Sequence, residues 1–273
     1  HAIQSTMAGN GVSVLVIPGD VSMQDADDDS FVESKISTGR PVVFPDPAEA
    51  AALTQAINEA KTVTLFVGAG VKDAREQVLK LAEKIKAPIG HALGGKMYIQ
   101  YENPFDVGMN GLLGYGAAHE ATHEADLLIL LGTDFPYNDF LPDANVAQVD
   151  INGSHIGRRT KISYPVTGDV AATIENILPH VDEKKDRSFL DKMLKKHYGK
   201  LEHVVEAYTS NVDKHTPIHP EYVADLIDRN ADEDAIFTVD TGMCNVWGAR
   251  YITANGKREQ IGSFRHGTMA NAL

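Results

Sequence analysis

Polar and apolar positions follow two patterns along the chain, one typical of buried strands and the other of amphipathic helices. Short, mostly apolar runs predict strands at 12–17, 63–67, 88–91, 127–131, 146–150 and 235–239. Apolar residues three or four positions apart predict helices at 47–61, 73–86, 114–124, 168–178, 187–208, 221–229 and 245–251. Because strands and helices take turns, we expect an α/β fold with a doubly wound parallel sheet covered by helices on both faces.

The same pattern divides the chain into five segments. Residues 47–182 form a Rossmann-like central domain, preceded by a linker at 21–46 that holds the acidic run from Asp25 to Asp29. A linker helix at 183–216 leads to a second α/β unit at 217–273. The strand at 12–17, within segment 1–20, has no earlier strand to pair with, and a helix has only begun at 269–273. We therefore expect the parent protein to continue in both directions.

Composition narrows the classes of partner. The chain has 273 residues and a formal net charge of -13, with 38 acidic against 25 basic residues. Such a surface repels phosphate backbones, so no nucleic-acid partner is expected. No apolar run approaches the roughly 20 residues of a membrane span. The single cysteine, Cys244, cannot form an intrachain disulfide, which favours a reducing, cytoplasmic location.

Glycines and polar residues follow the predicted strands, at the ends where parallel sheets bind ligands. The candidates are, in order, the turn Gly68-Ala69-Gly70, the stretch from His91 to Lys96, the stretch from Gly108 to Gly114, the stretch from Gly132 to Tyr137, Asp150 and Asp169. Glycines let a backbone approach a diphosphate, and an acid at a strand end accepts hydrogen bonds from a ribose. The aromatic residues of the fourth stretch, Phe135 and Tyr137, could flank a flat ring. Together these stretches predict a groove that cradles a nucleotide.

Each stretch alone has a structural alternative. The dinucleotide fingerprint places Gly or Ala where this chain has Asp73, so a tight strand-to-helix turn stays equally open for the first glycines. His91 fits a structural histidine better than a ligand contact. His119 and His123 lie four apart on a helix without a third ligand, so no zinc site is predicted. Cys244 fits a small apolar residue better than a nucleophile.

Several longer stretches resemble the thiamine-diphosphate-dependent family of pyruvate dehydrogenase (quinone) and pyruvate oxidase. Residues 11–20 (GVSVLVIPGD) resemble the end of its pyrimidine-binding domain, which assigns segment 1–20. The stretches that resemble its central FAD-binding domain, segment 47–182, are 84–96, 103–109, 130–137 and 149–152. Residues 262–272 (GSFRHGTMANA) resemble the opening of its diphosphate-binding domain, segment 217–273.

The resemblance implies roles for individual residues. Those that match flavin-contacting stretches are Asn110, Gly111, Leu112, Leu113, Thr133, Asp134, Phe135, Pro136, Tyr137, Asp150 and Ile151, and less closely Gly68, Gly70 and Asp169. Gly267, Thr268 and Met269 match the segment that holds the aminopyrimidine of thiamine diphosphate, with Met269 bending the cofactor. Gly242 matches a loop near the diphosphate. No catalytic residue and no metal ligand is expected within these residues.

The resemblance also implies a reaction. The parent enzyme would decarboxylate pyruvate with thiamine diphosphate and Mg²⁺ and pass two electrons through FAD to a quinone or to oxygen. It would be a cytoplasmic homotetramer, with a peripheral place at the membrane left open. The family's activating glutamate and magnesium motif lie outside these 273 residues. We therefore expect this piece to be inactive by itself.

Two rival interpretations remain. An acetolactate synthase-type carboligase shares the architecture and often FAD, although the aromatic residues Phe135 and Tyr137 favour the pyruvate-oxidising branch. A free-standing nucleotide-binding module is the alternative from outside the enzymes, and the unfinished ends of the chain disfavour it.

Overall fold

The computed structural model of the chain describes residues 1–9, 11–25, 35–37, 39–143, 145–203, 207–264 and 266–270. The chain divides into two units, residues 1–42 and 43–273, which are described separately. Most of the predicted acidic run at 25–29, the end of the predicted helix at 269–273 and part of the linker helix at 187–208 lie outside the described residues.

The first unit contains two short helices, α1 (Ala2–Gly9) and α2 (Gly19–Ser22). The strand predicted at 12–17 is wrong, because these residues adopt no regular structure and their side chains are exposed, Val12 to 92% and Val16 to 82%. A β-strand exists only when its backbone pairs with a neighbour, and among the described residues no strand pairs with 12–17. An apolar run alone therefore did not suffice.

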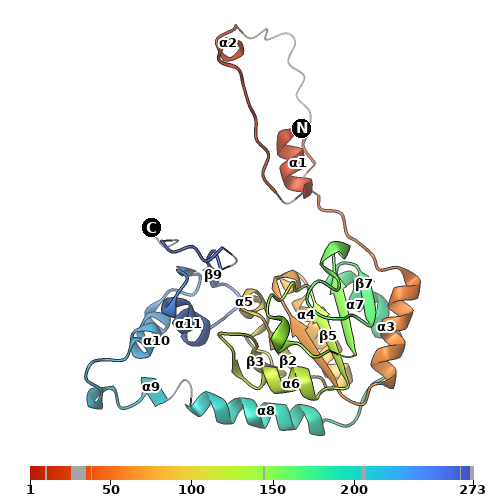
Figure 1. Ribbon diagram of the computed structural model, residues 1–273, viewed down its shortest axis with the longest axis vertical. Helices are drawn as coiled ribbons and strands as arrows, with labels where there is room; N and C mark the ends of the chain where they lie inside the picture. The colour runs from red at the N-terminus through yellow and green to blue at the C-terminus, as the bar shows by residue number, and fades with distance from the viewer. Residues whose placement is uncertain are drawn as a thin grey trace. The chain divides into compact units, whose positions relative to one another are not determined.

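A seven-stranded sheet dominates the second unit (Figure 1). Its strands, in chain order, are β1 (Val63–Val67), β2 (Ile89–His91), β3 (Asp106–Met109), β4 (Tyr115–Gly116), β5 (Leu127–Leu131), β6 (Val146–Asp150) and β7 (Tyr164–Thr167). They lie in the order β4-β3-β2-β1-β5-β6-β7, and every pair is parallel except β3 with β4. The predicted α/β class with a doubly wound parallel sheet is confirmed.

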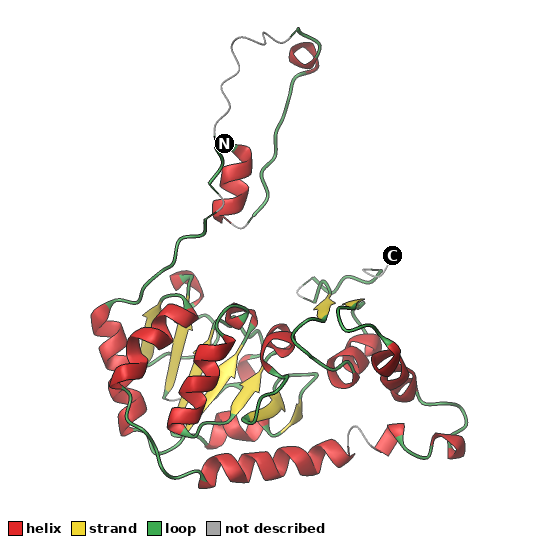
Figure 2. Cartoon of the chain, turned by 180° about the vertical axis from the view of Figure 1, so that it is seen from behind, coloured by secondary structure: helices red, strands yellow, loops and turns green. Residues whose placement is uncertain are grey.

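Helices cover both faces of this sheet (Figures 1 and 2). One face packs against α3 (Pro47–Glu59), α4 (Arg75–Ile85) and α7 (Val170–Ile177), which together with alternate strand residues form the largest apolar core. The other face packs against α6 (Ala118–Glu124), with α8 (Ser188–Leu201) alongside α6, β3 and β4. The central strands β1 and β5 are buried at every position, as their apolar sequences predict for a sheet covered on both faces.

Local sequence sets where these helices begin. Asp46 caps α3 by accepting hydrogen bonds from the backbone N–H groups of Ala48 and Glu49, and Pro47 occupies the first helical position. Asp169 caps α7 in the same way through the N–H of Ala172. The helix predicted at 114–124 begins only at Ala118, because residues 115–116 form β4. Gly116, at φ +76°, lies outside the helical region, and residues 115–116 pair with β3.

The remaining elements form a smaller α/β portion of the same unit. They are α9 (Ala207–Thr209), α10 (Pro220–Asn230), β8 (Ile236–Thr238), α11 (Met243–Tyr251) and β9 (Glu259–Ile261). The short helix α5 (Lys96–Ile99) belongs to the sheet domain, between β2 and β3. Strands β8 and β9 pair in parallel. The predicted linker helix at 187–208 ends earlier than expected, since the regular α-helix of α8 stops at Leu201.

Candidate functional site

The strand order reverses between β1 and β5, which makes their carboxyl ends the switch point where open α/β sheets bind ligands. The turns that follow the two strands touch. The N–H of Gly70 donates to the carbonyl of Gly132 over 2.9 Å, and the N–H of Gly68 donates to the carbonyl of Leu131 over 3.1 Å. The structure therefore joins two of the predicted stretches, 68–70 and 132–137, into one edge.

Packing requires the glycines at this contact. A Cβ on Gly70 would lie 2.6 Å from the Cα of Gly132, and one on Gly68 would lie 2.6 Å from the Cβ of Thr133. Gly132 itself has φ +57°, in the left-handed region. The tight-turn alternative for Gly68 and Gly70 thus has a direct structural reason, and their contact with a ligand stays a prediction.

The stretch after β3 packs onto the aromatic residues that follow β5. Asn110 donates to the carbonyl of Phe140 over 3.0 Å and accepts from the N–H of Gly111 over 2.9 Å. Gly111 has φ +105°, and a Cβ there would lie 3.0 Å from the ring of Tyr137 and 3.2 Å from the ring of Phe135. The third and fourth predicted stretches therefore meet at the same edge of the sheet.

The aromatic residues differ in what they could offer a ligand. Phe135 is buried, with its ring centroid 5.0 Å from that of Phe66 and 5.4 Å from that of Tyr137, so it belongs to the core of the second sheet face. Tyr137 is half-buried and Pro136 is exposed. The expectation that the aromatic residues flank a flat ring is therefore wrong for Phe135, because its ring is already enclosed by protein.

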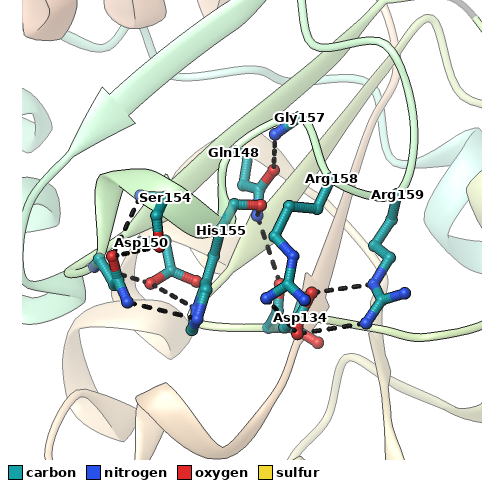
Figure 3. A network of polar contacts seen from close by, with 10 residues as sticks. Asp134, Gln148, Asp150, Ser154, His155, Gly157, Arg158 and Arg159 are labelled. Atoms are coloured by element: carbon teal, nitrogen blue, oxygen red, sulfur yellow. Dashed lines mark hydrogen bonds and ion pairs between the residues drawn. The ribbon is translucent and has the colours of Figure 1, made fainter.

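Asp134 forms a charged cluster with two arginines from the loop after β6 (Figure 3). Arg159 binds the carboxylate through two nitrogens, at 2.9 and 3.3 Å, and Arg158 binds it at 3.2 Å. Burial raises the pKa of Asp134, but the arginine hydrogen bonds and charges outweigh burial and hold that pKa below its ordinary value. Two cations on one carboxylate leave one positive charge in excess, and the Arg158 side chain is 46% exposed.

Asp150 lies in a second network beside this cluster (Figure 3). Its Oδ1 accepts a hydrogen bond from the N–H of Asn152 at 2.9 Å and lies 3.6 Å from Nδ1 of His155. Gln148 lies two residues before Asp150 on β6. Its side-chain amide donates to the carbonyls of Thr133 and His155 and accepts a hydrogen bond from the N–H of Gly157. These contacts fix the loop that carries the two arginines against the end of β5.

Three predicted polar residues are less accessible than a ligand groove requires. Asn110, Thr133 and Asp150 are only 4%, 6% and 5% exposed. The expectation that their side chains line an open groove is not met in this structure. Asn110 and Asp150 accept hydrogen bonds from the backbone of their own turns, and the side chain of Thr133 packs against Gly68. The accessible rim consists instead of backbone at Gly70 and the side chains of other predicted residues, chiefly Leu112 at 69% and Ile151 at 55% exposure.

Two further predictions fall elsewhere. Leu113 packs with Met109, Tyr115 and Ala249 rather than on the rim. Asp169 uses one carboxylate oxygen to cap α7, so its expected role towards a ribose stays a prediction beside a structural role that the structure shows.

The stretches matched to thiamine diphosphate meet at the start of α11. The N–H of Thr241 donates to the carbonyl of Thr268 over 3.2 Å, which places the Gly242 turn beside Gly267–Met269. Gly242 at φ +148° and Gly267 at φ +62° adopt backbone conformations that favour glycine. The side-chain oxygens Oγ1 of Thr241 and Oδ1 of Asn245 are buried without a hydrogen-bond partner among the described residues.

Sequence patterns missed a buried polar cluster beneath β2 and β3. Asp106 lies 3.7 Å from Nε2 of His91 and 3.9 Å from Nε2 of His197 on α8. Burial lowers the pKa of His91 to about 3 and that of His197 to about 4, and it raises the pKa of Asp106 to about 7. Both histidines are therefore neutral at pH 7, which agrees with the structural role expected for His91.

Comparison with known proteins identifies the sheet domain. Residues 50–177, which include most of the sheet and its switch point, match the family described as the thiamine pyrophosphate enzyme, central domain. The matched residues run from α3 to the end of α7, so the carboxyl edge described above lies within the match.

Three relatives align with nearly the whole chain. A Bacillus subtilis protein named as thiamine pyrophosphate-containing, YdaP, is 30% identical over 100% of this chain. An acetolactate synthase of Mycobacterium bovis is 28% identical over 100% of the chain, and the pyruvate oxidase of Lactiplantibacillus plantarum is 24% identical over 98%. The aligned regions make up 47%, 46% and 45% of these relatives. The chain thus spans about half the length of the curated relatives it matches.

None of the helices in the described ranges combines the length and hydrophobicity that crossing a bilayer requires. Within the same ranges, no three histidine, cysteine or acidic side chains gather where they could hold a metal ion.

Proposed function

We propose that the protein containing this chain is a thiamine pyrophosphate enzyme that oxidatively decarboxylates pyruvate and passes the electrons through FAD to a quinone or to oxygen. The observation that carries the proposal is the match of residues 50–177 to the central domain of thiamine pyrophosphate enzymes. The named relatives include a pyruvate oxidase and an acetolactate synthase. Both names support a member of the superfamily that acts on pyruvate-like substrates.

The carboxyl edge of the sheet fits FAD in three respects. Backbone at Gly70 is exposed at the switch point, where a dinucleotide is expected in this fold. The exposed apolar side chains of Leu112 and Ile151 offer contact area for the rings of the cofactor. Arg158 supplies the excess positive charge that a diphosphate needs on a protein of net charge -13.

The start of α11 fits thiamine diphosphate. Thr241 and Asn245 each carry a buried side-chain oxygen without a partner among the described residues, and such atoms are costly unless a ligand or water satisfies them. The exposed Met269 lies in the stretch beside them, where it would support the bent cofactor. When bound, thiamine diphosphate supplies the carbon nucleophile and electron sink for decarboxylation. The residues of this chain would bind and orient it.

Acetolactate synthase-type carboligation is the second candidate, since the acetolactate synthase relative aligns as fully as the pyruvate oxidase. The half-exposed Tyr137 beside Pro136 supports the oxidising branch, because the family resemblance associates this aromatic stretch with pyruvate oxidation. Phe135 contributes to that stretch only through the core.

One experiment separates the two activities. Protein produced from the complete gene, supplied with FAD, thiamine diphosphate and Mg²⁺, is expected to reduce an artificial electron acceptor only when pyruvate is present. The same samples are assayed for acetolactate. Acetolactate formation without acceptor reduction would decide for the carboligase, and failure of the protein to bind either cofactor would refute both.

A further inference from the structure

Lys96 is a fully buried lysine that neither candidate cofactor site uses. Its residue is 1% exposed, at the start of α5 and immediately after the turn that follows β2. Its ammonium donates to the carbonyl of Gly248 at 3.3 Å and to the carbonyl of Ile252. Both acceptors lie at the carboxyl end of α11, about 150 residues further along the chain. The contact therefore joins the sheet domain to the helix that begins at the Gly242 turn.

Burial of a charged amine is costly unless several groups compensate it. The carboxyl end of a helix is one such group, since the aligned peptide dipoles give it a partial negative charge. Burial lowers the pKa of Lys96 to about 7, while the carboxylates of Asp228 on α10 and Asp106 on β3 act in the opposite direction. The carboxyl end of α11 and the acids from both portions of the unit therefore favour the charged form of Lys96, which burial disfavours.

Two other contacts hold the same end of α11 against the sheet. Ala249 is fully buried in a cluster with Met109 and Tyr115, and Arg250 donates to the carbonyl of Gly114 over 3.3 Å. The partners of these two contacts lie in β3, in β4 or in the turn between them, next to the stretch assigned to FAD. Lys96 adds the only contact of the three in which a buried charge meets the helix terminus itself, so it fixes the position of the helix along its axis.

Because an α-helix is stiff, fixing one end of α11 also fixes the turn at its other end. That turn contains Thr241 and Gly242. Its position determines where the side-chain oxygens of Thr241 and Asn245 lie, which have no hydrogen-bond partner in the part of the chain that the structure describes. We propose that Lys96 is a positioning residue that anchors the carboxyl end of α11 to the sheet domain and thereby holds the Thr241–Asn245 segment ready for the diphosphate of thiamine diphosphate. The ligand part of this inference rests on the proposed function, whereas the anchoring part does not.

The test compares Lys96→Met with Lys80→Met in protein produced from the complete gene and loaded with FAD. Methionine keeps most of the length of the Lys96 stem and removes the amine. Lys80 is a matched control, since its side chain is 57% exposed and pairs only with Glu76 within α4 among the described residues. Loss of a hydrogen-bonded buried charge is expected to raise the half-saturating concentration of thiamine diphosphate by about tenfold or more. The value of kcat at saturating cofactor and the FAD absorbance spectrum are expected to stay unchanged.

A second readout tests anchoring without any cofactor. Trp247 lies on α11 and is the single tryptophan of these 273 residues, so its fluorescence emission reports the environment of that helix once any tryptophan elsewhere in the complete protein is replaced by phenylalanine. Lys96→Met is expected to shift this emission to longer wavelength and to speed hydrogen exchange at 243–252, and Lys80→Met to do neither. Saturating thiamine diphosphate should reverse the shift, because a bound ligand stabilises the state that binds it. A general loss of stability would also speed hydrogen exchange in the central strands at 63–67 and 127–131, which Lys96→Met is expected to leave unchanged.

The outcomes separate the two ideas. If the wild-type protein binds no thiamine diphosphate, the proposed function fails, and the Trp247 and exchange data still decide whether Lys96 anchors α11. If Lys96→Met leaves both the half-saturating concentration and the Trp247 emission at their wild-type values, the inference is overturned. Should that variant not fold, Lys96→Gln, which keeps a donor but no charge, takes its place with the same readouts, and wild-type behaviour there overturns the inference equally.

Discussion

Substitution of Gly132 by alanine tests whether the contact between the β1 and β5 turns is as tight as the structure indicates. At φ +57° an alanine would be strained by about 1–2 kcal/mol, the usual cost of the left-handed conformation. Its Cβ would also lie 2.6 Å from the Cα of Gly70, which is backbone and cannot rotate away. Overpacking of this kind adds about 1–3 kcal/mol, so the total expected destabilisation is about 2–5 kcal/mol.

Gly157 provides the matched control for that substitution. It has φ +77°, also in the left-handed region, but a Cβ there would meet no atom within 4 Å. Gly157→Ala should therefore cost only the conformational strain, about 1–2 kcal/mol. Both variants lose the same unfolded-chain entropy when glycine becomes alanine, so that effect cancels when the two are compared. The difference of about 1–3 kcal/mol isolates the clash with the Gly68–Gly70 turn.

The assay is urea unfolding followed by far-ultraviolet circular dichroism, with the free energy of unfolding taken at constant slope. Gly132→Ala is further expected to weaken FAD binding, because the turn that carries Thr133 and Asp134 must shift. Equal destabilisation by the two substitutions, or a larger effect at Gly157, would refute the reasoning that backbone contact makes Gly132 necessary.

Two more predictions concern charge. Arg158→Gln should raise the dissociation constant for FAD, measured by flavin fluorescence, by about 5- to 30-fold, because it removes the exposed cation at the rim. Arg187→Gln breaks an exposed ion pair with Asp191 at the start of α8 and should leave that constant unchanged. Equal effects of the two substitutions would contradict the role assigned to Arg158. His197 is neutral when folded until about pH 4 but takes up a proton near pH 6.5 when unfolded, so its contribution to stability is present above pH 6.5 and lost as pH falls. His197→Asn should therefore flatten the fall in unfolding free energy between these pH values by up to about 1.4 kcal/mol per pH unit. Asp106, whose pKa burial raises to about 7, changes the unfolding free energy in the opposite direction in both proteins. An unchanged slope would show that His197 is not buried.

The bounds of the central strands could be predicted well, because a strand that is buried on both faces has a nearly continuous apolar sequence. β1, β5 and β6 have the predicted bounds, 63–67, 127–131 and 146–150. β3 was not predicted as a strand, since its sequence Asp-Val-Gly-Met contains a buried carboxylate and a glycine at φ +92°. The apolar run at 12–17 failed for the opposite reason, because hydrophobicity cannot supply the hydrogen-bonding neighbour that a strand requires.

The candidate site shows the same limit at the level of side chains. Strand ends identified which turns would meet, and the structure brings the stretches at 68–70, 110–113 and 132–137 together. Which side chains face outward depends on packing between segments far apart in sequence. Asn110 and Thr133 turn inward, whereas Asp134 pairs with Arg158, which lies 24 positions later in the chain. The hydrogen-bond partners of Lys96 lie at 248 and 252, so the sequence around Lys96 does not indicate them.

The burial of the polar residues changes what kind of site the sheet edge is. Side chains such as Asn110 and Asp150, already bonded within the protein, set the shape of the turns, so a cofactor lying on them would be held by exposed backbone, apolar contacts and Arg158. Backbone and apolar contacts recognise the shape of a dinucleotide more than the identity of its atoms. Specific chemistry would then depend on the segment around α11, whose position Lys96 fixes relative to that edge. A single buried amine would in this way relate the proposed FAD site to the proposed thiamine diphosphate site.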